Sequence, residues 1–192
     1  MKAGRRKLLT SKYRLSSVLF AFLFLLPACV RAGYIDIYTD TIIDSNLGVG
    51  VYVYDSATLT MLSGSATAIQ LLDTSICNVY GGAVVSYVLS DSSTLNLYGG
   101  VFNGYNNYVT YFSSSAKIYV YGQNFQIKSV SENDTSVILS GNWLDGTSFK
   151  IYFRGLPQSF YDALGTNIFL VPEPATMLLM IVGALGFKKL KH

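Results

Sequence analysis

Five stretches of the chain share one pattern, in which apolar and polar residues alternate up to a closing glycine. In order they read DSATLTMLSG (55–64), DTSICNVYGG (73–82), DSSTLNLYGG (91–100), SSAKIYVYG (114–122) and DTSVILSG (134–141). The glycines that close them are Gly64, Gly81, Gly99, Gly122 and Gly141. A repeat length of roughly 20 residues is typical of solenoids, whose units stack on one another.

Alignment on those glycines places similar residues in columns. The column two places before the glycine is apolar throughout: Leu62, Val79, Leu97, Val120 and Leu139. The column four places before it is mostly apolar: Thr60, Cys77, Leu95, Ile118 and Val137. The column immediately before it holds Ser63, Tyr80, Tyr98, Tyr121 and Ser140. Alternation with a period of two predicts β-strands with one buried and one solvent-facing side.

The spacing of the units predicts the fold class, a short right-handed parallel β-helix. Each unit fits one coil, and about six coils are expected to stack at roughly 4.8 Å each. The Gly-Gly, Asp-Ser and Asp-Thr pairs of the units fit the corners of such coils, where positive φ angles and side-chain to backbone hydrogen bonds are needed. An antiparallel β-sandwich, which also has short strands and frequent turns, is the alternative.

The region after the last unit predicts antiparallel strands that cap the open C-terminal end of the solenoid. Asp145-Gly146 is a hairpin-turn sequence that precedes the strand pattern SFKIYF (148–153). NIFLV (167–171) predicts a final strand.

The N-terminus has the pattern of a secretory signal peptide. A basic leader is followed by the apolar stretch VLFAFLFLL (18–26), which is shorter than the roughly 20 residues that span a bilayer. Small residues before Gly33 predict cleavage between Ala32 and Gly33. In the alternative interpretation, Leu26-Pro27-Ala28-Cys29 is a lipobox that would leave Cys29 lipidated.

The C-terminus has three parts: VPEPAT (171–176), an apolar run that extends from 175 to 187, and a basic end with Lys188, Lys189 and Lys191. Pro172 and Pro174 hold Glu173 in an extended conformation, because proline fits neither a regular helix nor a central strand. The apolar run predicts a short transmembrane helix, and the lysines can reach the cytoplasmic interface.

This C-terminal tail resembles the PEP-CTERM sorting signal of bacterial exported proteins. The resemblance implies that a membrane-embedded exosortase recognises Pro172, Glu173 and Pro174 and removes the tail. The body would then reach the cell surface or the extracellular matrix of a bacterium, where exopolysaccharide is a candidate partner. We therefore divide the chain into a signal peptide (1–32), a β-solenoid body (33–170) and a sorting signal (171–192), with signal peptidase, exosortase and the membrane as its processing partners.

The formal net charge of +3 comes from the two ends. Between residues 33 and 174 there are four cations, Lys117, Lys128, Lys150 and Arg154, and all 11 acidic residues, so the body's net charge is 4 − 11 = −7. Such a body lacks the positive surface that nucleic acids require.

The sequence shows little sign of catalysis or of a metal or other cofactor. His192 is the single histidine and lies in the tail, which excludes catalysis by a nucleophile–histidine pair in the body. Cys77 falls in a predicted inward column and is expected to be a buried apolar residue. Asp55, Asp73 and Asp91 occupy equivalent corners, where they fit turn formation better than an acid–base pair or a calcium site.

The outward column of Tyr80, Tyr98 and Tyr121 is the candidate binding surface. Stacked aromatic rings could contact sugar rings, with Asn78, Asn96, Asn103 and Asn106 as hydrogen-bonding partners, or they could stabilise neighbouring coils. We expect a non-catalytic surface or matrix protein with a structural or adhesive role. The alternatives are a glycan-binding module and a small polysaccharide-active enzyme on the same scaffold.

Overall fold

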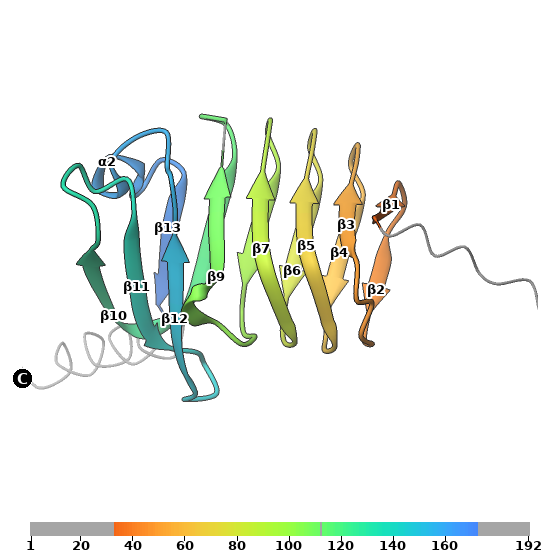
Figure 1. The fold of residues 1–192 in the computed structure, drawn as a ribbon, viewed down its shortest axis with the longest axis horizontal. Helices are drawn as coiled ribbons and strands as arrows, with labels where there is room; N and C mark the ends of the chain where they lie inside the picture. Colours follow the sequence, from red (N-terminus) through yellow and green to blue (C-terminus); the bar gives the residue numbers. More distant parts are fainter. Residues whose placement is uncertain (1–32, 112, 173–192) are drawn as a thin grey trace, which may run out of the picture. The chain divides into compact units, whose positions relative to one another are not determined.

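A computed structural model describes residues 33–111 and 113–172, and almost all of its regular structure is β-strand (Figure 1). The strands are β1 (Tyr34–Ile37), β2 (Thr41–Ile43), β3 (Gly50–Val53), β4 (Thr58–Met61), β5 (Ser65–Leu71), β6 (Ile76–Val79), β7 (Ala83–Leu89), β8 (Thr94–Leu97), β9 (Asn103–Tyr111), β10 (Lys117–Ser129), β11 (Val137–Asn142), β12 (Ser148–Phe153) and β13 (Ile168–Pro172). One short helix, α2 (Phe160–Ala163), begins after the N-cap residue Ser159.

The strands alternate between two parallel ladders. β1, β3, β5, β7 and β9 pair in one ladder, which we call the odd ladder. β2, β4, β6, β8 and the first part of β10 pair in the other, the even ladder. Each coil therefore supplies one strand to each ladder, which confirms the parallel β-solenoid and excludes the β-sandwich. The solenoid has about four turns, whereas about six coils were expected.

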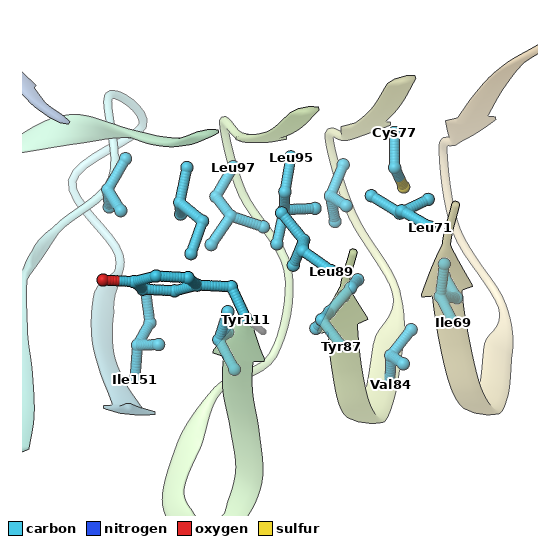
Figure 2. Close-up of a cluster of buried hydrophobic side chains, with 14 of the residues drawn as sticks. Ile69, Leu71, Cys77, Val84, Tyr87, Leu89, Leu95, Leu97, Tyr111 and Ile151 are labelled. Carbon is cyan, nitrogen blue, oxygen red and sulfur yellow. The ribbon is translucent and has the colours of Figure 1, made fainter. Parts of the chain in front are cut away.

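The buried columns lie between the two ladders. In the even ladder, Leu97 pairs with Val79 on one side and with Val120 on the other, as the repeat predicted. Side chains from the odd ladder, such as Leu71, Leu89 and Tyr111, pack against this column (Figure 2). The inward-facing side chains of both ladders are almost all fully buried, so the core runs continuously through the coils.

The alignment of the first unit was wrong by one residue. Met61, not Leu62, pairs with Val79 and is buried, while 49% of Leu62 is exposed. For the same reason Leu59, not Thr60, pairs with Cys77. Gly64 corresponds to Gly82 instead of Gly81, since both adopt a left-handed φ (79° and 84°) at the same corner. With this correction, paired residues of β4, β6 and β8 are all one repeat of 18 residues apart, and we call the coils that contain these strands the regular coils.

The C-terminal end is closed by antiparallel strands, as predicted. The second part of β10 pairs antiparallel with β11, and β11 pairs antiparallel with β12 around the Asp145-Gly146 turn. β12 also pairs with β9 of the odd ladder, and β10 also pairs with β8 of the even ladder. The three strands β10, β11 and β12 therefore join the two ladders. We call β10 after Gly122, β11 and β12 the cap.

The fifth repeat unit is part of this cap and not a coil. Its Leu139 pairs with Ile127 of β10 and with Ile151 of β12, both in antiparallel register. The number of coils was overestimated because an apolar alternation is the same in parallel and antiparallel strands.

The last strand, β13, was predicted to belong to the antiparallel cap, but it returns to the even ladder and pairs parallel with the first part of β10. Within the described ranges, no helix has the length and apolarity needed to cross a bilayer. The predicted signal peptide (1–32) and the apolar run 175–187 lie outside the described residues, as do Ala32, Glu173 and Pro174.

Candidate functional site

The predicted tyrosine column forms a continuous stack on the outside of the even ladder. The ring centroids of Tyr80 and Tyr98 are 4.7 Å apart, and those of Tyr98 and Tyr121 are 4.2 Å apart. Their planes differ by 5° and 17°, respectively. The stack forms because each tyrosine directly follows an inward residue of the same row, namely Val79, Leu97 and Val120.

The stacking determines which atoms of the tyrosines can meet a ligand. The spacing of the rings is close to the separation of neighbouring strands, about 4.8 Å, so each ring covers much of one face of the next. Ring edges and hydroxyl groups therefore make up most of the surface that faces solvent. Partial burial of Tyr98, together with its hydrogen bond to Tyr121, raises the pKa of Tyr98 to about 12.

A second outward column runs beside the tyrosines. Asn96 donates a hydrogen bond from its amide nitrogen to the Asn78 side-chain oxygen at 2.9 Å. In the same column Tyr119 stacks on Phe169, with centroids 4.7 Å apart and planes 15° apart. We call the two columns together the tyrosine face: Asn78, Tyr80, Asn96, Tyr98, Tyr119, Tyr121 and Phe169.

Two of the predicted partners do not belong to this face. Asn103 and Asn106 lie on β9 in the odd ladder, where Asn103 pairs with Lys150 of β12. Conversely, sequence analysis missed Tyr119 and Phe169. Nothing in the sequence places Phe169 beside Tyr119, because the two are distant along the chain and only the return of β13 to β10 joins them.

The corner aspartates bind the backbone of the neighbouring coil. Asp55, Asp73 and Asp91 all adopt a left-handed φ, between 52° and 57°. The Asp73 carboxylate accepts a hydrogen bond from the backbone N–H of Asp55 at 3.0 Å, and that of Asp91 accepts one from the N–H of Asp73 at 3.2 Å. These contacts give Asp73 and Asp91 a structural role, since their carboxylates fix the turn one coil before them.

The other candidate groups also have structural roles. Cys77 is fully buried, and this burial raises the pKa of its thiol well above the ordinary value, which disfavours the reactive thiolate. In the part of the chain that the structure describes, no three His, Cys, Asp or Glu side chains form a group that could hold a metal ion.

The sorting signal begins at the edge of the body. β13 ends at Pro172, which has no N–H to donate and therefore fits the end of a strand at the edge of a ladder. Val171 pairs with Tyr121 and Pro172 with Gly122, so the first two residues of the predicted sorting segment are still part of the even ladder.

Comparison with known families finds a match to this C-terminal segment. Residues 170–189 match the PEP-CTERM protein-sorting motif. No curated protein and no solved structure matches the chain. The motif identifies the chain as an exported protein, made as a membrane-anchored precursor and processed by an exosortase.

Proposed function

We propose that the body is a non-catalytic structural or adhesive protein of the bacterial cell surface or extracellular matrix. The tyrosine face is the observation that carries this proposal. It repeats similar outward side chains over successive coils of a rigid scaffold, as an extended contact surface requires. The sorting motif supports the setting, because exosortase processing delivers the body outside the cytoplasmic membrane.

The chemistry of the tyrosine face favours contact with a hydroxyl-rich or peptide surface. Phenol hydroxyls both donate and accept hydrogen bonds, as do the amides of Asn78 and Asn96, and the ring edges add apolar area. Of this face, 52% of Tyr80 is exposed, and Tyr98 and Tyr121 are partly exposed. Exopolysaccharide is a partner with the required hydroxyl groups.

The adhesive role can be tested with the processed protein from an exosortase-containing bacterium. The measurement is retention of the protein on the cell surface and in isolated extracellular matrix. Tyr80→Ala combined with Tyr98→Ala should lower retention several-fold. Tyr161→Ala is the matched control, since the exposed fraction of Tyr161 is also 52% and it lies on α2, away from both columns. Equal retention of the double variant and the control would contradict the proposal.

Processing of the two ends can be tested on the same material. Mass spectrometry of the mature protein should find an N-terminus at Gly33 and no residues from the apolar run 175–187. Glu173→Ala should leave the tail attached. A mature chain that retains residues 175–187 in the wild type would contradict removal of the tail.

A small polysaccharide-active enzyme is the second candidate, and among the described residues the corner aspartates are the carboxylates that suggest it. Asp73→Asn with Asp91→Asn keeps the size of each side chain, an acceptor oxygen and the tolerance for a left-handed φ, but removes both acids. We expect no polysaccharide breakdown from the wild type or the variant. Breakdown that the double variant abolishes would favour the enzyme.

A further inference from the structure

The outer side of the cap holds a hollow of about 510 Å³ that lies apart from the tyrosine face. It is lined by three carboxamide side chains, two serines and one lysine, above two aromatic rings: Asn124, Gln126, Asn142, Ser140, Ser148, Lys150, Phe102 and Phe149, together with Gly141. The polar residues occupy alternate positions of β10, β11 and β12, so they share the outer side of the three strands.

A break in strand pairing lies at this hollow. From Gln123 to Gln126 the chain advances three residues along β10, while its partner β11 advances two, from Asn142 to Ser140. Asn124 lies inside this irregular segment and has a left-handed φ of 56°. A β-bulge of this kind bends the strand and redirects its side chains, and such bulges are common beside binding sites.

The inner wall of the hollow is aromatic. Phe149 and Phe102 are almost fully buried, with exposed fractions of 2% and 5%. A Cβ added at Gly141 would lie 2.9 Å from the Phe149 ring, so any other residue at this position would collide with the ring and fill the space beside it. The glycine therefore keeps the base of the polar depression free of a side chain, above two rings that are almost fully buried.

The polar groups of the hollow are suited to hydroxyl groups. A carboxamide offers both a donor and an acceptor, as does a serine hydroxyl, and a sugar hydroxyl requires both. The side chains of Asn124 and Gln126 are exposed and have no hydrogen-bond partner among the described residues. A hydroxyl-rich ligand can therefore bind them without breaking an internal contact.

Lys150 adds the single charge of the lining. It is exposed, and no described acidic residue forms an ion pair with it. Asp145 is the acidic residue of the adjacent hairpin, and its carboxylate instead accepts hydrogen bonds from the backbone N–H and the hydroxyl of Thr147. One unpaired cation among neutral polar groups favours a ligand that can place a carboxylate there, beside its hydroxyl groups.

We propose that this hollow is a binding site for an acidic oligosaccharide, with the sugar's carboxylate at Lys150 and its hydroxyls at Asn124, Gln126 and Asn142. The inference deepens the adhesive function proposed above by naming a ligand class, and it relies on that function only for the extracellular setting.

The test is calorimetric titration of the processed protein with a galacturonic acid trisaccharide. A neutral galactose trisaccharide and inorganic phosphate serve as comparison ligands. We expect the acidic trisaccharide to bind at least about tenfold more tightly than either one. No binding of the acidic trisaccharide at millimolar concentration, or equally tight binding of phosphate, would overturn the proposal.

Variants then locate the site. Lys150→Gln should lower the affinity for the acidic trisaccharide at least about tenfold and leave that for the neutral one unchanged. Lys128→Gln is the matched control, because Lys128 lies two residues beyond Gln126 on the same side of β10 but does not line the hollow. Asn124→Gly, which keeps the left-handed backbone, should weaken binding of both sugars.

The outcomes distinguish this site from the tyrosine face. Unchanged affinity in Lys150→Gln, or loss of trisaccharide binding in Tyr98→Ala, would overturn the assignment to the hollow. Trisaccharide binding that survives in the non-adhesive Tyr80→Ala, Tyr98→Ala variant would support both proposals at once. Thermal unfolding of each variant checks that it is folded.

Discussion

The regular coils and the cap both bury apolar side chains from neighbouring strands, but they differ in how those neighbours are related in sequence. In the coils, residues one repeat apart pair in parallel, so that Leu59, Cys77 and Leu95 form one row. In the cap, Leu139 lies between Ile127 and Ile151 in antiparallel register, without any fixed spacing. A repeated sequence therefore specifies the coils, whereas the cap is specified by a single set of contacts.

The side chains that fill the core also differ between the two regions. The rows of the even ladder consist of aliphatic residues, Met61 and Cys77. The cap is filled with aromatic rings: Trp143 packs on Phe149 at 4.1 Å and on Phe102 at 5.8 Å between ring centroids. The Trp143 indole N–H donates to the carbonyl oxygen of Gly100 at 3.1 Å, which ties the cap to the last regular corner. Aromatic rings therefore fill the end of the solenoid, where the aliphatic rows of the even ladder do not continue.

Truncation of a central core residue should have the largest effect. Leu97→Ala leaves a cavity between Val79 and Val120, and we expect it to lower the free energy of unfolding by about 3 kcal/mol. Urea denaturation of the processed protein measures this loss. Leu62→Ala, at the exposed position that the repeat had predicted to be buried, should change stability by less than about 0.5 kcal/mol. Equal losses for the two variants would contradict the register of the coils.

Two left-handed glycines test whether corners are crowded in the coils and open in the cap. A Cβ at Gly82 would lie 2.7 Å from the carbonyl oxygen of Gly64, whereas a Cβ at Gly146 would have no heavy atom within 4 Å apart from its own chain neighbours. Gly82→Ala should therefore cost at least about 2 kcal/mol and Gly146→Ala about 1 kcal/mol, the latter from backbone strain alone. A larger loss of stability for Gly146→Ala than for Gly82→Ala in urea denaturation would contradict this difference between the corners.

The corner aspartates should show a smaller effect that depends on the replacement. Asp73→Ala loses both the acceptor for the Asp55 N–H and the tolerance for a left-handed φ, so we expect a loss of about 1–2 kcal/mol. Asp73→Asn retains both features and should cost less than about 0.5 kcal/mol. If both variants lose the same stability, the charge, and not the turn, is what matters at this corner.

At high pH the tyrosine stack should make the stability of the coils depend more strongly on pH than that of the cap. The pKa of Tyr98 is raised to about 12, so the folded state favours the neutral phenol. This contribution to stability is fully present below the unfolded pKa of about 10 and is lost as pH rises through the folded value. Burial also raises the pKa of Tyr87 and Tyr111, so ultraviolet titration should show several tyrosines that ionise late, and Tyr98→Phe should lower their number by one. An unchanged number of late-ionising tyrosines in that variant would show that Tyr98 is not one of them.

At low pH the hairpin of the cap should show the smallest effect. Hydrogen bonds from the Thr147 hydroxyl and N–H lower the pKa of Asp145 below its ordinary value, which is about 3.9. The resulting stability is present above that unfolded value and is lost as pH falls through the folded one. Asp145→Asn should therefore flatten the dependence of the urea midpoint on pH below about 4. An unchanged acid slope would show that Asp145 is not the group responsible.

Sequence reasoning was most successful where the chain repeats. Alternation around Leu95 and Leu97 predicted the strands, their parallel stacking and the outward tyrosines, because each of these follows from a local pattern that recurs. It was wrong at the first unit, where a single glycine, Gly64, left the alignment ambiguous by one residue. The φ angles resolve that ambiguity and the sequence does not.

The alternation, the recurring coil and the PEP-CTERM motif at residues 170–189 can all be recognised in the amino-acid sequence. These are local features, and each can be recognised without knowledge of its neighbours in space. The tertiary structure alone decided that 134–141 turns antiparallel, that Phe169 joins Tyr119, and that Lys150 and Gln126 line the same hollow. Such contacts join segments with no shared spacing, and so they are selected by packing at the end of the solenoid and not by any pattern along the chain.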